Sequence, residues 1–164
     1  IEIHPEVFSP GHFISTRVVL EYLRRCSLKG LRVLERGCGT GAIAPLAASR
    51  GADVVASDIN PAAVANARAN AARNGVAGQI HFFQTNVLEP GWNAKPADLV
   101  CANILTSVLL EAAPLILRTT GKRMILSGIR EIEADAVADT FIQLGGREIS
   151  RDGDGKWCGL VIDV

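Results

Sequence analysis

The sequence predicts a doubly wound α/β fold, built on a mostly parallel seven-stranded sheet that a C-terminal antiparallel hairpin completes. Two observations predict it. Short runs rich in Val, Ile and Leu alternate with helical patterns along most of the 164 residues. A glycine-rich turn follows the first run and opens a helix, a pattern typical of ligand-binding sheets of this class. A composition of 48% hydrophobic and 21% charged residues is that of a globular chain, and we expect residues 1–164 to form one domain.

The expected strands and helices alternate along the chain. Strands are expected at residues 31–35, 53–57, 79–84, 97–102, 121–127, 145–151 and 157–164. Helices are expected at residues 16–26, 42–48, 62–74, 104–118 and 131–144. A turn-rich link joins the last two strands and predicts the hairpin. The chain is thereby divided into a lead-in with the first helix, a cofactor-binding core and the hairpin, at residues 1–29, 30–144 and 145–164.

Local signals set two of the helix boundaries. Ser15 or Thr16 is expected to cap the first helix, because a hydroxyl can accept a bond from a free N–H of the first turn. Pro114 is expected to interrupt the helix 104–118, because proline has no N–H and its ring crowds the preceding turn.

The stretch after the first strand indicates a nucleotide-binding crevice. The strand ends at the acid Glu35, and glycines follow at alternate positions, Gly37, Gly39 and Gly41. Glycines there let the backbone turn sharply and approach a ligand before the chain enters a helix. The next strand ends at Asp58, whose carboxylate can accept bonds from ribose hydroxyls. This strand-turn-helix-strand unit is half of a Rossmann-like site.

The glycine pattern alone leaves the nucleotide open, since it also satisfies a loose NAD or FAD fingerprint. Glu35 favours S-adenosylmethionine, because a carboxylate would repel a pyrophosphate and attract the ammonium and sulfonium groups. The roughly thirty residues before the first strand point the same way, because a dinucleotide domain usually starts at the strand. A structural turn without any ligand is the third interpretation.

Polar strand ends are expected to converge on one crevice, because ligands bind beyond the carboxyl ends of parallel strands. The candidate cofactor-binding residues at these ends are Glu35, Gly37, Cys38, Gly39, Thr40, Gly41, Asp58, Ile59, Asn86, Val87 and Asn103. We expect Glu35 and the glycine turn to face the methionine part of the cofactor and Asp58 to face its ribose. We expect Ile59 to lie against the adenine, and the Asn86 side-chain oxygen to bond its amino group.

Asn103 is the candidate catalytic residue. Methyl transfer from a sulfonium is an in-line displacement, for which alignment and exclusion of water supply much of the acceleration. The Asn103 carbonyl can accept a bond from an amine N–H and direct the nitrogen lone pair at the methyl group. A lysine acceptor must also lose its proton, which desolvation would favour. The alternative is that Asn103 only caps the helix that follows.

Composition excludes several other classes. The 17 basic and 17 acidic residues balance, which disfavours tight nucleic-acid binding. The four cysteines form no C-x-x-C pair, so no zinc or other metal site is expected, and they suggest a reducing cytosol. No apolar stretch approaches the length of a membrane span. No feature of the sequence indicates an oligomeric state.

Together these motifs resemble a known family. Val33–Gly41 with Asp58–Pro61 resembles class I S-adenosylmethionine-dependent methyltransferases. Within them, Ala102–Leu105, Ile125–Ile129 and Trp157-Cys158 are similar to the catalytic domain of ribosomal protein L11 methyltransferases. The resemblance implies methylation of protein amino groups, with a separate amino-terminal recognition domain that has no counterpart in this sequence.

The sequence also departs from that family. The family's Gly-Thr-Gly-Thr-His loop is replaced by Ser9–Thr16, in which only Thr16 matches, as a contact on the methionine side. The lead-in Pro5–Pro10 instead resembles release-factor glutamine methyltransferases, but those enzymes carry Asn-Pro-Pro-Tyr where this chain has Asn103–Thr106. A protein amine is therefore the expected acceptor. The alternatives are a glutamine acceptor, a small-molecule N- or O-methyltransferase, and an inactive cofactor-binding module.

Overall fold

A computed structural model describes residues 2–3, 5, 7, 14–89 and 95–164. The sheet strands are β1 (Arg32–Arg36), β2 (Asp53–Asp58), β3 (Ile80–Gln84), β4 (Ala97–Asn103), β5 (Thr120–Arg130), β6 (Arg147–Gly153) and β7 (Trp157–Asp163). The α-helices are α1 (Ile14–Arg25), α2 (Ile43–Ser49), α3 (Pro61–Arg73), α4 (Thr106–Thr119) and α5 (Ala134–Gln143). Two short 3-10 turns are η2 (Ala77–Gln79) and η3 (Glu131–Glu133). Each predicted strand and α-helix is present.

The strands form one seven-stranded sheet in the order β3-β2-β1-β4-β5-β7-β6. The pairs from β3 through β5 are parallel, whereas β7 runs antiparallel to both β5 and β6. The predicted mostly parallel sheet with a C-terminal hairpin is confirmed. The strand order reverses between β1 and β4, which is where ligands bind in open sheets of this kind.

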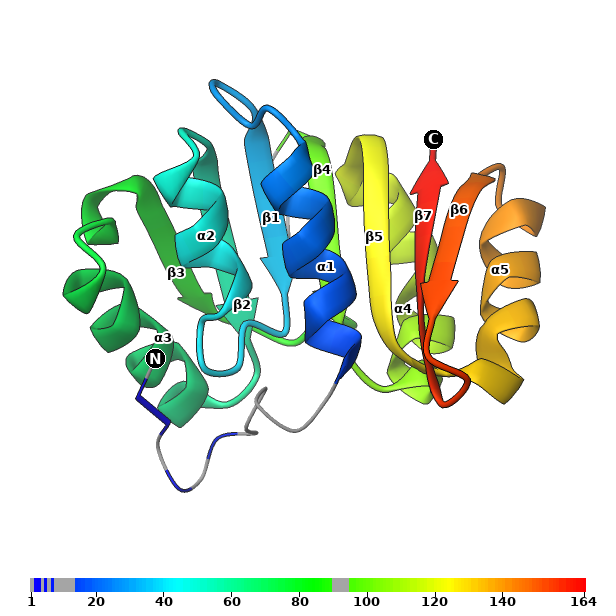
Figure 1. The fold of residues 1–164 in the computed structure, drawn as a ribbon, viewed down its shortest axis with the longest axis horizontal. Coiled ribbons are helices and arrows are strands. Elements are labelled where there is room, and N and C mark those ends of the chain that lie inside the picture. The colour runs from blue at the N-terminus through cyan, green and yellow to red at the C-terminus, as the bar shows by residue number, and fades with distance from the viewer. Residues whose placement is uncertain (1, 4, 6, 8–13, 90–94) are drawn as a thin grey trace.

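Helices cover both faces of the sheet (Figure 1). One core joins the sheet to α1, α2 and α3, and the other joins it to α4 and α5. Successive strand residues alternate between these cores: Leu99 packs in the first and Val100 in the second. Both faces of the central strands are therefore buried, which explains their nearly continuous apolar sequence. None of the helices in the described residues has both the length and the apolar composition of a membrane-spanning segment.

Two predicted helix boundaries are wrong. Helix α1 begins at Ile14, so Ser15 and Thr16 lie inside its first turn and do not cap it. Instead, the Thr16 hydroxyl accepts a bond from Asn103 at the end of β4, and the Ser15 carbonyl accepts one from Ser127 within β5. Helix α4 continues through Pro114, which is exposed, because the neighbouring residues Ala113 and Ile116 are fully buried in the core.

Strand β5 is longer than predicted. It runs on past Ser127, and its pairing with β7 shifts between Leu126 and Ile129. Gly128, inside this irregularity, has a positive φ of 81°. The predicted helix 131–144 is correspondingly shorter, since the 3-10 turn η3 occupies its first residues.

Candidate functional site

A cavity of about 840 Å³ opens at the carboxyl ends of the parallel strands. The register explains why. Arg36 on β1 pairs with Ser57 on β2 and with Ala102 on β4. The next residues of these strands, Asp58 and Asn103, therefore lie on either side of the glycine turn that follows β1. Every predicted site residue except Gly41 lines this cavity: Thr16, Glu35, Gly37, Cys38, Gly39, Thr40, Asp58, Ile59, Asn86, Val87 and Asn103.

The glycine turn adopts a backbone that only glycine accepts easily. Gly37, Gly39 and Gly41 have φ of 77°, 49° and 75°. The N–H of Gly37 donates to the Ser57 carbonyl at 2.8 Å. A Cβ on Gly41 would lie 2.8 Å from the Cα of Ala67 on α3, whereas a Cβ on Gly39 would meet nothing within 4 Å. Gly41 thus packs the turn against α3, and Gly39 faces open space.

Asp58 holds the turn from the neighbouring strand. One carboxylate oxygen accepts the Gly39 N–H at 2.9 Å, and the other accepts the Asn60 N–H at 2.9 Å. Both bonds fix the orientation of the carboxylate at the cavity wall. Ile59, which follows, is 63% exposed and lines the cavity, so its apolar side chain is open to contact with a flat apolar ligand.

Glu35 is the buried acid of the site. Only 1% exposed, it accepts the Ala44 N–H in the first turn of α2 at 2.9 Å. Burial raises its pKa well above the ordinary value, and the nearby Asp58 charge adds to the rise, whereas the Ala44 bond opposes it. A cation placed in the cavity would favour the charged carboxylate. Burial likewise raises the pKa of the Cys38 thiol, which disfavours a reactive thiolate there.

Asn86 and Val87 line the cavity from the loop after β3. The Asn86 side-chain oxygen accepts the Leu88 N–H at 3.0 Å, which turns the loop back toward the cavity. Leu88 also lines it, so this wall presents one amide and two apolar side chains. The expected bond from Asn86 to an adenine stays a prediction.

Asn103 is held by the first turn of α1. Its side-chain N–H donates to the Thr16 hydroxyl at 2.9 Å, and the Ser127 hydroxyl donates to the Ser15 carbonyl at 2.6 Å. A Cβ on Gly128 would lie 3.1 Å from the Asn103 side-chain oxygen, so glycine at that position leaves room for it. With the nitrogen occupied by Thr16, the side-chain oxygen is the acceptor end of the amide.

Sequence reasoning missed most of an apolar wall of the cavity. Ile104 follows β4, Leu105 and Val108 lie at the start of α4, and Trp157 is the first residue of β7. The rule that sites lie at the carboxyl ends of parallel strands finds Ile104, but it does not find a residue that begins an antiparallel strand. The described residues include no group of three His, Cys, Asp or Glu side chains placed to hold a metal ion.

A family model described as ribosomal protein L11 methyltransferase (PrmA) matches residues 1–163. The chain belongs to this family. A relative from Pelotomaculum thermopropionicum, named ribosomal protein L11 methyltransferase, is 38% identical over 164 residues, which are 98% of this chain and 53% of the relative. The chain spans about half the length of the curated relatives that it matches.

Solved structures agree with this family and fold. A ribosomal protein L11 methylase from Lactobacillus delbrueckii subsp. bulgaricus superposes with a TM-score of 0.87 and 28% identity, covering 98% of this chain and 82% of the other. Magnesium protoporphyrin IX methyltransferase from Synechocystis, solved with bound S-adenosylmethionine, gives a TM-score of 0.73 and 20% identity over 95% of this chain and 86% of that one. The predicted class I methyltransferase fold is confirmed.

Proposed function

We propose that this L11 methyltransferase family member transfers a methyl group from S-adenosylmethionine to an amine of a ribosomal protein of the L11 type. One observation carries the proposal: the turn held by Asp58 and the amide held by Thr16 line the same cavity, at neighbouring strand ends. The names of the relatives support the acceptor, since these are described as L11 methyltransferases. The four free cysteines fit the cytosolic location that such an acceptor requires.

The residues present fit the cofactor. About 840 Å³ is within the range of small-molecule sites. Glu35 lines the cavity, and a cationic methionine end beside it would offset the cost of burial and favour the charged carboxylate. Asp58 suits the ribose hydroxyls, and Ile59 and Val87 suit the flat adenine. S-adenosylmethionine, when bound, supplies an electrophilic methyl group that needs no further activation.

The chain's own residues would then align and desolvate the acceptor. The Asn103 oxygen accepts one N–H of the incoming amine and so sets the direction of its lone pair. Ile104, Leu105 and Trp157 exclude water around it. This apolar wall disfavours the charged ammonium and lowers the amine pKa, so the reactive neutral amine is more populated.

The test is methyl transfer from labelled S-adenosylmethionine to purified ribosomal protein L11. We expect label in the protein, and we expect Asn103→Ala to abolish the transfer while binding of S-adenosylhomocysteine persists. Label in small amines but not in the protein would instead support a small-molecule methyltransferase. Binding of S-adenosylhomocysteine without transfer to any acceptor would support an inactive cofactor-binding module.

A further inference from the structure

Asn70 on α3 is a fully buried amide whose hydrogen-bonding capacity is completely used. Its side-chain nitrogen donates to the Thr40 carbonyl at 2.9 Å and to the Glu2 carbonyl at 2.7 Å. Its side-chain oxygen accepts the Glu2 N–H at 2.9 Å and an Arg73 N–H at 3.2 Å. Two donors and two acceptor positions are all that an asparagine amide offers. No part of this side chain is left for a further partner.

Thr40 connects Asn70 to the site. It lies between Gly39 and Gly41 in the glycine turn, is buried, and lines the cavity. Helix α3 therefore supports the turn from behind at two points, through the close packing of Gly41 on Ala67 and through the bond from Asn70 to the Thr40 carbonyl. Because Asn70 is 0% exposed, water does not replace that bond in the folded chain.

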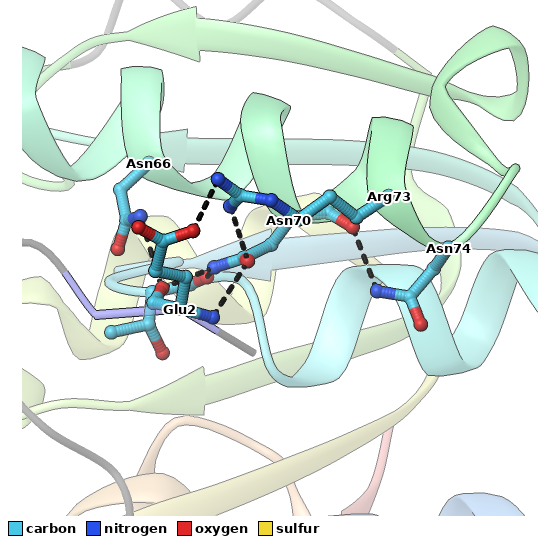
Figure 2. Close-up of polar contacts among 6 residues, drawn as sticks. Glu2, Asn66, Asn70, Arg73 and Asn74 are labelled. Atoms are coloured by element: carbon cyan, nitrogen blue, oxygen red, sulfur yellow. Dashed lines mark hydrogen bonds and ion pairs between the residues drawn. The ribbon is translucent and has the colours of Figure 1, made fainter.

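Glu2 connects Asn70 to the amino-terminal segment. Both backbone polar groups of Glu2 pair with the Asn70 amide, as neighbouring strands pair in a sheet. Figure 2 shows Glu2 lying along the face of α3 that carries Asn66, Asn70 and Arg73. Asn66 donates to the Glu2 carbonyl at 3.1 Å, and Arg73 forms an ion pair with the Glu2 carboxylate. These residues, spaced four and three apart, form a docking face for an extended segment.

We propose that Asn70 is a positioning residue for the glycine turn and that docking of the Glu2 segment strengthens cofactor binding through it. The inference rests on the proposed function, because the ligand of the turn is S-adenosylmethionine. The segment fills two of the four hydrogen-bonding positions of Asn70 and so holds the amide in the orientation that supports Thr40. Segment docking and ligand binding then favour each other, as linkage requires.

The test is a double-mutant cycle between Glu2 and Asn70. Glu2→Ala removes the ion pair and keeps both backbone bonds, so it is the matched control for Glu2→Pro, which also lacks the N–H that Asn70 accepts. Going from Glu2→Ala to Glu2→Pro is expected to weaken S-adenosylhomocysteine binding about threefold, the effect of one hydrogen bond. In the Asn70→Ala background the same step is expected to change nothing. Should Asn70→Ala fail to fold, Asn70→Ser takes its place in the cycle.

Hydrogen exchange of backbone amides in the glycine turn measures the same coupling in the absence of any cofactor. The Gly39 N–H donates to Asp58 and the Gly41 N–H donates to Cys38, so exchange of these two amides reports the order of the turn. We expect both to exchange about threefold faster in Glu2→Pro than in Glu2→Ala, and this difference to vanish in Asn70→Ala.

The outcomes separate the two proposals. Equal exchange and equal affinity in Glu2→Ala and Glu2→Pro would overturn the coupling, as would equal losses in the Asn70 and Asn70→Ala backgrounds. A third outcome is that the Gly39 and Gly41 amides exchange faster in Glu2→Pro than in Glu2→Ala, but the chain binds no S-adenosylhomocysteine. This outcome would overturn the proposed function and leave Asn70 as the support of the turn. Asn74→Ala is a control, because the Asn74 side chain bonds to the Asn70 backbone carbonyl and not to the Asn70 side chain. This variant is expected to change neither the affinity nor the exchange rates.

Discussion

The glycine turn meets two requirements: Gly41 packs closely against α3, and Gly39 leaves open space in the cavity. Adding one methyl group at each position tests the two requirements separately. At Gly41 an added Cβ meets the Ala67 Cα at 2.8 Å and φ is 75°, whereas at Gly39 it meets nothing within 4 Å and φ is 49°. A left-handed backbone costs an L residue about 1–2 kcal/mol. Overpacking costs about 1–3 kcal/mol more. Gly41→Ala should therefore lose about 2–5 kcal/mol of stability and Gly39→Ala about 1–2 kcal/mol.

Urea unfolding of both variants measures this difference, provided that the m-value is unchanged. The direct effect on ligand binding should have the opposite order, being larger for Gly39→Ala than for Gly41→Ala. Gly39 lines the cavity, so its methyl group stands where the ligand would lie, and we expect Gly39→Ala to weaken S-adenosylhomocysteine binding at least about tenfold despite its small loss of stability. Gly41 does not line the cavity, and Gly41→Ala acts on binding only through the position of the turn.

Equal stability losses in the two variants would refute the packing of the turn against α3. A larger loss in Gly39→Ala would refute it as well. Unchanged ligand binding in Gly39→Ala, with the fold intact, would show that the ligand does not approach the turn at Gly39.

Three further predictions follow from the buried groups. Burial raises the Glu35 pKa above its ordinary value of 4.5, so the folded chain holds a proton that the unfolded chain releases. The protonated Glu35 therefore stabilises the folded chain at low pH, and this stabilisation is lost as the pH rises from 4.5 toward the raised pKa. Glu35→Gln should therefore gain thermal stability over the parent as pH rises from about 5 to about 8, and bind S-adenosylmethionine more weakly; a gain that shrinks with pH would contradict this sign. Thr16→Val removes the acceptor that holds Asn103 and should lower turnover about tenfold with a smaller loss of S-adenosylhomocysteine affinity, which parallel kinetics and calorimetry would check. Phe141 is a fully buried residue of α5, so Phe141→Ala should cost about 3–5 kcal/mol in urea unfolding, and a loss under about 1 kcal/mol would contradict that burial.

Much of the site could be predicted because one rule of sheet geometry brings it together. Glu35, Asp58 and Asn103 are far apart in sequence but end strands that run parallel. Parallel strands place their carboxyl ends at one edge, so the sequence order of strands and polar ends was sufficient. The glycines between them carry their own signal, since positive φ excludes most other residues.

The rest depends on tertiary contacts that leave no local pattern. Trp157 reaches the cavity only because β7 inserts antiparallel between β5 and β6. In the sequence, Asn70 is indistinguishable from other polar residues of an alanine-rich helix. Its role follows only from its tertiary contacts with the glycine turn and the amino-terminal segment. Pro114 signals a break that packing of its neighbours overrides. Of the replaced loop Ser9–Thr16, named above as a departure from the family, residues 9–13 lie outside the described residues.

The most direct test of the central claim is calorimetric titration of the chain with S-adenosylhomocysteine, with NAD in parallel. The arrangement of Glu35, Asp58 and the glycine turn predicts micromolar binding of S-adenosylhomocysteine, its loss in Asp58→Ala, and no binding of NAD. Binding of NAD without S-adenosylhomocysteine would contradict the account.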